Sequence, residues 1–283
     1  MDNKDVVWYK KKGVPKLLAG AVIVGLIVLI VLLSIVWTPY DPNLPNVSDR
    51  LLPPLSTGHN GQSYYLLGTD QLGRDNLSRV MAGGQVSVLI AFLAVLLSVV
   101  MGAVLGVMCG YFGKTLDNIV GMFVEIQHSI PMLLIIVMVL TLFGSSTVVL
   151  AVGLSLSEWL SIFRQTRAKT LVERKKDYTL AARVMGAGDG WIVFRHLIPN
   201  VMASIIVYGT LLIGTTILAE AGLSFLGLGV QRPYATWGRM ISDGQTYMAT
   251  GWWVSVFPAL AVALLVIGVN FLGDGLRAKL KME

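Results

Sequence analysis

Apolar residues in this chain gather into long blocks separated by more polar stretches. Three blocks are uncharged over 21 to 24 residues, namely 17–37, 86–109 and 252–272. Each can cross a hydrocarbon core about 30 Å thick as a helix that rises about 1.5 Å per residue. Three weaker blocks, 119–143, 148–163 and 201–219, lie between them. We therefore predict an all-α, polytopic membrane protein with about six transmembrane helices.

The composition agrees with a membrane protein. The 283 residues are 55% hydrophobic and only 13% charged, and their mean hydropathy is +0.71, which is too apolar for an ordinary soluble domain. Blocks 119–143 and 148–163 nevertheless carry Glu125 and Glu158, and a charge at mid-membrane costs at least about 2.5 kcal/mol. Both helices therefore need protein or water on one face, and we predict Glu125, His128 and Glu158 to be polar membrane residues or parts of a pathway.

Lys and Arg are unevenly distributed among the segments that join the blocks. Alternate segments, beginning with 1–16, hold 17 of the 22 basic residues, and the others hold five. Since basic residues concentrate on the cytoplasmic side, we predict that both termini are cytoplasmic. The net charge of +6 then reflects topology and anionic membrane lipid, and it gives no reason to expect nucleic acid.

This topology divides the chain into parts. Block 17–37 is expected to be an uncleaved anchor, because its apolar run is longer than that of a signal peptide. The predicted parts are a cytoplasmic tail (1–16), a first transmembrane helix (17–37), an extracytoplasmic loop (38–84), a five-helix core (85–273) with a cytoplasmic loop (164–199), and a cytoplasmic tail (274–283).

A row of small residues follows the second block at four-residue spacing: Ser98, Gly102, Gly106 and Gly110. Such a row lets another helix approach closely, which is how apolar helices associate in lipid. We expect this face to pack within one subunit, and a subunit interface is the alternative.

Two further features predict local geometry. Pro131 follows Glu125, Gln127 and His128, so the third block should bend there and have a polar inner end. The outer loop ends in the stretch 68–75, where Thr69 or Asp70 can cap a short helix and Arg74 can pair with Asp70 or Asp75. We interpret this stretch as a cap over the outer mouth.

The segment 164–199 predicts two short helices outside the membrane. Asp177 can cap the first, which ends near Gly186, and Asp189 can cap the second, which Pro199 interrupts. Tyr178, Ala181, Ala182 and Met185 fall at i, i+3, i+4 and i+7, which places them on one apolar face. That stripe either packs under its own bundle or docks into a groove of a partner protein.

The chemistry of an enzyme is not indicated. The triplet Gly113–Lys114–Thr115 lacks the earlier glycine and the strand of a phosphate-binding loop. The three histidines, His59, His128 and His196, are dispersed, and the single Cys109 excludes an internal disulfide. We predict no catalytic, cofactor-binding or metal site, so uphill transport would need energy from ions or from a partner.

Four stretches of the chain (67–79, 110–118, 222–240 and 270–277) resemble the inner-membrane permeases of ABC importers for dipeptides, oligopeptides and nickel. Segment 164–199 is similar to the family's EAA loop, because Ala181, Ala182, Gly186 and Pro199 match it in register. Leu180 replaces the glutamate of that pattern, and Arg232 stands where the family often has proline.

The resemblance implies a type I importer permease of the second paired kind. It implies a heterodimer with a homologous permease, two ATPase subunits that hold ATP and Mg²⁺, and an extracytoplasmic solute-binding protein, in the inner membrane of a prokaryote. Residues implied to couple to the ATPase are Asp177, Tyr178, Ala181, Ala182, Arg183, Met185, Gly186, Ala187 and Pro199. Peptides are the first expected substrate, and nickel or a metal–chelator complex is the alternative.

Two other classes remain open from the residues alone. An ion-coupled secondary transporter would use Glu125 or Glu158, but it leaves the apolar stripe unexplained. A membrane scaffold without transport leaves both glutamates unexplained.

Overall fold

A computed structural model describes residues 3–231 and 234–280, with side chains from Gly13 onward, so Arg232 and the end of the tail lie outside the described residues. The helices are α1 (Asn3–Val36), α2 (Asn76–Phe112), α3 (Lys114–His128), α4 (Met132–Phe143), α5 (Thr147–Glu173), α6 (Asp177–Val184), α7 (Asp189–Ile192), α8 (Ile198–Phe225), α9 (Trp237–Gln245) and α10 (Trp253–Lys279). The shorter elements are a 3₁₀ turn η1 (Val47–Asp49), an antiparallel pair β1 (Ser56–Thr57) and β2 (Tyr64–Tyr65), and a π-helical turn η2 (Val193–Leu197).

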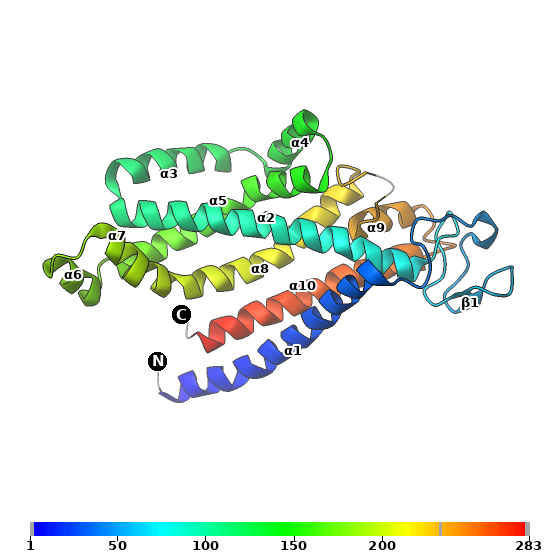
Figure 1. Cartoon of the computed structure of the whole chain (residues 1–283), viewed down its shortest axis with the longest axis horizontal. Coiled ribbons are helices and arrows are strands. Elements are labelled where there is room, and N and C mark those ends of the chain that lie inside the picture. Colours follow the sequence, from blue (N-terminus) through cyan, green and yellow to red (C-terminus); the bar gives the residue numbers. More distant parts are fainter. Residues whose placement is uncertain (1–2, 232–233, 281–283) are drawn as a thin grey trace.

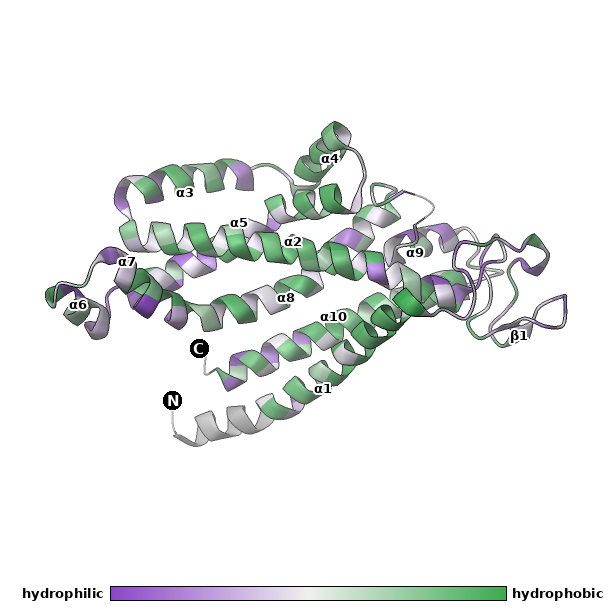
Figure 2. Ribbon diagram, viewed as in Figure 1, coloured by the Kyte–Doolittle hydropathy of each residue, from purple (hydrophilic) through white to green (hydrophobic). Residues whose placement is uncertain are grey.

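Long helices run the length of the molecule, with the loop before α2 at one end and α6 and α7 at the other (Figure 1). The described ends of the chain lie toward the α6–α7 end. Among the described residues, five helices are long and apolar enough to cross a membrane, and the pair α3 and α4 would make a sixth span. In Figure 2, where the ribbon is coloured by residue hydropathy, hydrophobic residues predominate along the long helices. The predicted all-α, polytopic fold with about six spans is confirmed.

The third span is broken where Pro131 predicted a bend. Helices α3 and α4 meet at an angle of 90° across a break at residues 129–131. A proline lacks the N–H that an unbroken helix would use, and it disfavours helical geometry at the residue before it. Both arms leave many apolar side chains uncovered by this chain, among them Phe123, Leu134 and Phe143.

The long helices extend beyond the blocks that predicted them, and α2 and α5 are examples. Helix α2 begins at Asn76, inside the predicted loop 38–84, because Asp75 caps it and accepts a hydrogen bond from the Ser78 backbone N–H at 2.8 Å. Helix α5 continues to Glu173, past the predicted end of its apolar block. Hydropathy marks the part of a helix that lies in lipid, whereas caps decide where the helix ends.

The core of the bundle lies where α2 crosses α5 and α8. One cluster of buried side chains joins α2, α4, α5 and α8, and it includes Ile90, Ile136 and Leu154. A second joins α1, α2, α8, α9 and α10 around Trp237 and Leu265. The bundle therefore has its own packed interior while much of its periphery stays apolar, as expected for a protein surrounded by lipid.

The small-residue row on α2 faces α5 of the same chain. Ser98 Oγ donates a hydrogen bond to the Ser155 carbonyl at 3.2 Å. A Cβ atom added at Gly102 would lie 2.7 Å from Ile162 Cβ, and one at Gly110 would lie 2.6 Å from Thr170 Cβ. The two helix backbones are thus too close together for larger side chains along this row.

Gly106→Leu is expected to force α2 and α5 apart, because even a Cβ atom there would lie 2.7 Å from Thr166 Cβ. Overpacking typically costs about 1–3 kcal/mol, so the midpoint of thermal unfolding in detergent should fall. Gly121→Leu on α3 is the matched control, since nothing lies within 4 Å of an added Cβ there. Equal midpoints for the two variants would show that the face of Gly106 does not pack against α5.

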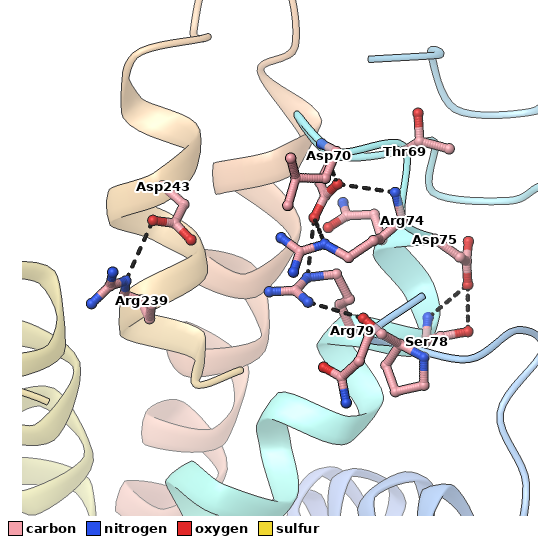
Figure 3. Close-up of polar contacts among 12 residues, drawn as sticks. Thr69, Asp70, Arg74, Asp75, Ser78, Arg79, Arg239 and Asp243 are labelled. Carbon is pink, nitrogen blue, oxygen red and sulfur yellow. Dashed lines mark hydrogen bonds and ion pairs between the residues drawn. The ribbon is translucent and has the colours of Figure 1, made fainter. Parts of the chain in front are cut away.

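The outer loop is held by a buried ion-pair cluster instead of a short helix (Figure 3). Asp70 accepts from the Arg74 guanidinium at 2.7 Å and lies 3.2 Å from that of Arg79. Its other oxygen accepts from the Leu72 and Arg74 backbone N–H groups, so the chain turns around the carboxylate and no helix begins there. The predicted pair of Asp70 with Arg74 is confirmed, and the predicted helix after Thr69 or Asp70 is wrong.

Candidate functional site

The α6–α7 segment (residues 174–197) is attached to the last turn of α2 through Tyr111. The Tyr111 hydroxyl donates to Asp189 at 2.5 Å and accepts from the Arg183 guanidinium at 3.1 Å. Arg174 donates to the Tyr111 carbonyl at 2.7 Å. One residue of α2 thus contacts the segment before α6, α6 itself and α7, so motion of this segment is tied to motion of a long helix.

Glu173, the last residue of α5, holds the other side of the segment. Its carboxylate accepts from Lys176 at 2.8 Å and from the Tyr178 hydroxyl at 2.6 Å. Burial and this hydrogen bond to the carboxylate raise the pKa of Tyr178 to about 12. The segment is therefore joined to both α2 and α5.

The predicted stripe does not form one exposed face. Ala182 is buried at 2% exposure and packs with Tyr111, Ile192 and Leu197 of this chain. Tyr178 is half-buried and lies beside the His196 ring at 5.6 Å between centroids. Ala181 and Met185 are exposed. The interpretation of all four residues as one outward face is corrected, because α6 turns its Thr179 and Ala182 side toward the bundle.

A different set of apolar side chains points outward, and we call it the end surface. Its members are Leu180, Val184, Met185, Trp191 and Phe194, which are 45% to 88% exposed. A hollow of about 380 Å³ lies beside them, between Ala182, Met185 and Trp191. Sequence reasoning missed Val184, the most exposed at 88%, although its apolar side chain in a basic segment was a usable signal.

The remaining predicted residues of the segment have local roles. Lys176, and not Asp177, occupies the cap position of α6, and α6 ends at Val184, two residues before Gly186, whose φ of +83° suits glycine. There the Ala187 backbone N–H donates to the Ala182 carbonyl at 3.0 Å, which closes the helix end. Asp189 is the first residue of α7 and Gly188 its cap. The predicted interruption at Pro199 is wrong, because α7, η2 and α8 form one continuous helix and Pro199 lies in the first turn of α8.

The predicted polar membrane residues are not brought together. Glu158 is 8% exposed and accepts from Thr216 Oγ1 of α8 at 2.5 Å. Glu125 and His128 are exposed on α3. Sequence reasoning missed Glu220, which is fully buried on α8 and accepts from Ser224 at 2.7 Å. In the part of the chain that the structure describes, no three His, Cys, Asp or Glu residues are grouped as metal ligands would be.

Residues 102–281, more than half of the chain, match the family described as the inner membrane component of binding-protein-dependent transport systems. The chain belongs to this family. The matched residues include the last part of α2, residues 102–112, and every later helix, so the α6–α7 segment lies inside the family's shared region.

Individual relatives of this inner membrane component come from several bacteria. A di/tripeptide transport system permease protein of Pseudomonas aeruginosa is 36% identical over 260 residues, which cover 92% of this chain and 86% of the relative. An oligopeptide transport system permease protein of Escherichia coli is 39% identical over 223 residues, 79% and 74% of the two chains. A dipeptide transport system permease protein of Bacillus subtilis is 32% identical over 271 residues, which cover 95% of this chain and 82% of the relative.

The family and the five or six candidate spans make this protein a multi-pass inner membrane transport subunit. The predicted resemblance to importer permeases is confirmed by both the family match and the relatives.

Proposed function

We propose that this permease forms half of the membrane pathway of an ATP-driven peptide importer, and that the end surface seats in the ATPase subunit. The exposure of the Val184 and Met185 side chains, at 88% and 80%, is the observation that best supports this contact with the ATPase. Apolar side chains so exposed outside a membrane mark contact sites for a partner. Both belong to the α6–α7 segment that Tyr111 and Glu173 tie to α2 and α5.

The proposed assembly contains a homologous second permease, two ATPases and an extracytoplasmic binding protein. ATP and Mg²⁺ would be held by the ATPases and not by this chain, which acts as a transport subunit and not as an enzyme. The α6–α7 end would be cytoplasmic, together with both termini. The concentration of Lys and Arg in the segments at that end supports this orientation.

Peptides are the proposed solutes because the relatives described above are named for di-, tri- and oligopeptide transport. The proposed cycle is alternating access. ATP draws the ATPases together, α6 and α7 move with them, and the attached ends of α2 and α5 open the bundle outward.

Affinity purification of the tagged permease from its own cells in mild detergent tests the assembly. We expect mass spectrometry to find a second permease in equal amount and two ATPase chains carrying a phosphate-binding loop sequence. A permease that purifies alone and takes up peptide on a proton or sodium gradient would instead be a secondary transporter.

A further inference from the structure

Helix α5 carries a polar face across the inner end of its apolar block, which ends at residue 163. Ser161, Arg164 and Gln165 are exposed in this chain, and Ser157, one turn earlier, is half-buried. Arg164 precedes the end of α5 by nine residues, or about 13 Å along the helix axis. Because hydrocarbon cannot solvate such groups, this face needs protein or water against it.

Two hollows adjoin this face and share Ser161. The first, of about 320 Å³, is lined on its polar side by Gln127, His128, Ser157, Ser161 and Arg164. The second, of about 200 Å³, lies between α5 and α8 and includes Gln165, Tyr208 and Thr215. Together they form a trough that continues from the break after α3, along α5, to α8; it is largely polar beside α3 and mainly apolar, with a few polar groups, between α5 and α8.

Two arginines on neighbouring turns of α5 differ in their partners. Arg167 binds Asp117 of α3 with two hydrogen bonds of 2.5 Å, so its charge serves the fold. Arg164 lines the trough and has no acidic partner among the described residues. A guanidinium without an acidic partner offers a planar pair of donors to a carboxylate.

We propose that this trough is the permease's own wall of the solute pathway, and that Arg164 binds a carboxylate of the passing solute. The inference rests on the proposed function, and it adds which chemical group of the peptide this chain recognises, namely a carboxylate. The hydroxyl and amide groups of Ser161, Gln165 and Thr215 can exchange hydrogen bonds with peptide groups, whereas a lipid-facing surface would not offer them.

Thiol accessibility tests the trough. In the assembled transporter with Cys109→Ser, we expect Ser161→Cys and Thr215→Cys to react with a charged methanethiosulfonate reagent. Leu26→Cys on α1 is the control and should stay unreactive, because that apolar position is 55% exposed in this chain and should face lipid. Unreactive thiols at both trough positions would overturn the assignment of this face, whether or not the protein transports peptides.

Uptake of a matched peptide pair tests Arg164. In proteoliposomes, we expect Arg164→Gln to lower uptake of a free-acid peptide about tenfold or more, as for loss of a charged hydrogen bond. Uptake of the same peptide with an amidated C-terminus should change little, and Arg164→Lys should retain part of the preference. The ratio of variant to wild type is taken for each peptide separately, so discrimination by the binding protein cancels.

Equal ratios for the two peptides would overturn the role of Arg164. If the wild type itself shows no ATP-dependent uptake of either peptide, the proposed function fails, and the labelling result still decides whether the trough is open to water.

Discussion

Asp70→Asn is expected to destabilise the outer end of the bundle by about 3–5 kcal/mol, the usual cost of removing one partner from a buried ion pair. Asp70, Arg74 and Arg79 have side chains only 2%, 9% and 5% exposed, so the two guanidinium groups could not turn to water without opening the loop. Arg79 also donates to the Pro42 carbonyl at 2.9 Å, which ties the loop after α1 to α2.

Thermal unfolding in detergent and limited proteolysis of the loop measure this effect. Asp274→Asn is the matched control, because its ion pair with Lys16 is 51% exposed on both sides and should contribute at most about 1 kcal/mol. Similar midpoints and similar rates of loop cleavage for the two variants would contradict a structural role for the buried cluster.

Val184→Glu is expected to weaken ATPase binding by tenfold or more, because it places a charge in the middle of a contact that should exclude water, at a cost of roughly 1–3 kcal/mol. The variant should still insert and fold, since Val184 is 88% exposed and its replacement touches no buried group. Binding is measured by titrating purified ATPase onto the permease pair in nanodiscs.

Val47→Glu is the matched control, an identical substitution at 70% exposure in the outer loop at the opposite end of the molecule. Ala182→Glu would be a poor probe of docking, because Ala182 is buried and the new charge would disrupt the packing of α6 itself. If Val184→Glu binds the ATPase as tightly as the wild type does, the end surface is not the ATPase-binding surface.

Features that depend on neighbouring residues could be predicted from the sequence. The uncharged blocks, the break at Pro131 and the spacing of Gly102, Gly106 and Gly110 all follow from local pattern and helical periodicity. The outward face of α6 could not be predicted in this way. Contacts with Tyr111 set it, and Tyr111 lies 72 residues before its partner Arg183 in the chain. In a helix of only eight residues, periodicity defines a stripe without saying which side meets the bundle.

The trough could not be predicted from the sequence either. Arg164 and Arg167 are both basic residues near the end of an apolar block, and nothing local separates them. Their difference comes from Asp117, which reaches Arg167 from another helix and leaves Arg164 beside the hollow. Glu158, which was predicted as a polar membrane residue, contacts Thr216 between α5 and α8 instead of facing the trough.

Peptide uptake into proteoliposomes tests most directly whether import is driven by ATP and depends on contact between the end surface and the ATPase. The vesicles contain the permease pair and the ATPases, the binding protein and labelled peptide are supplied at the outer-loop face, and ionophores abolish every ion gradient. We expect wild type and Val47→Glu to accumulate peptide only when ATP is present at the α6–α7 face, and Val184→Glu to lose accumulation and stimulated ATP hydrolysis together. Accumulation that is independent of ATP, or unchanged in Val184→Glu, would contradict this function.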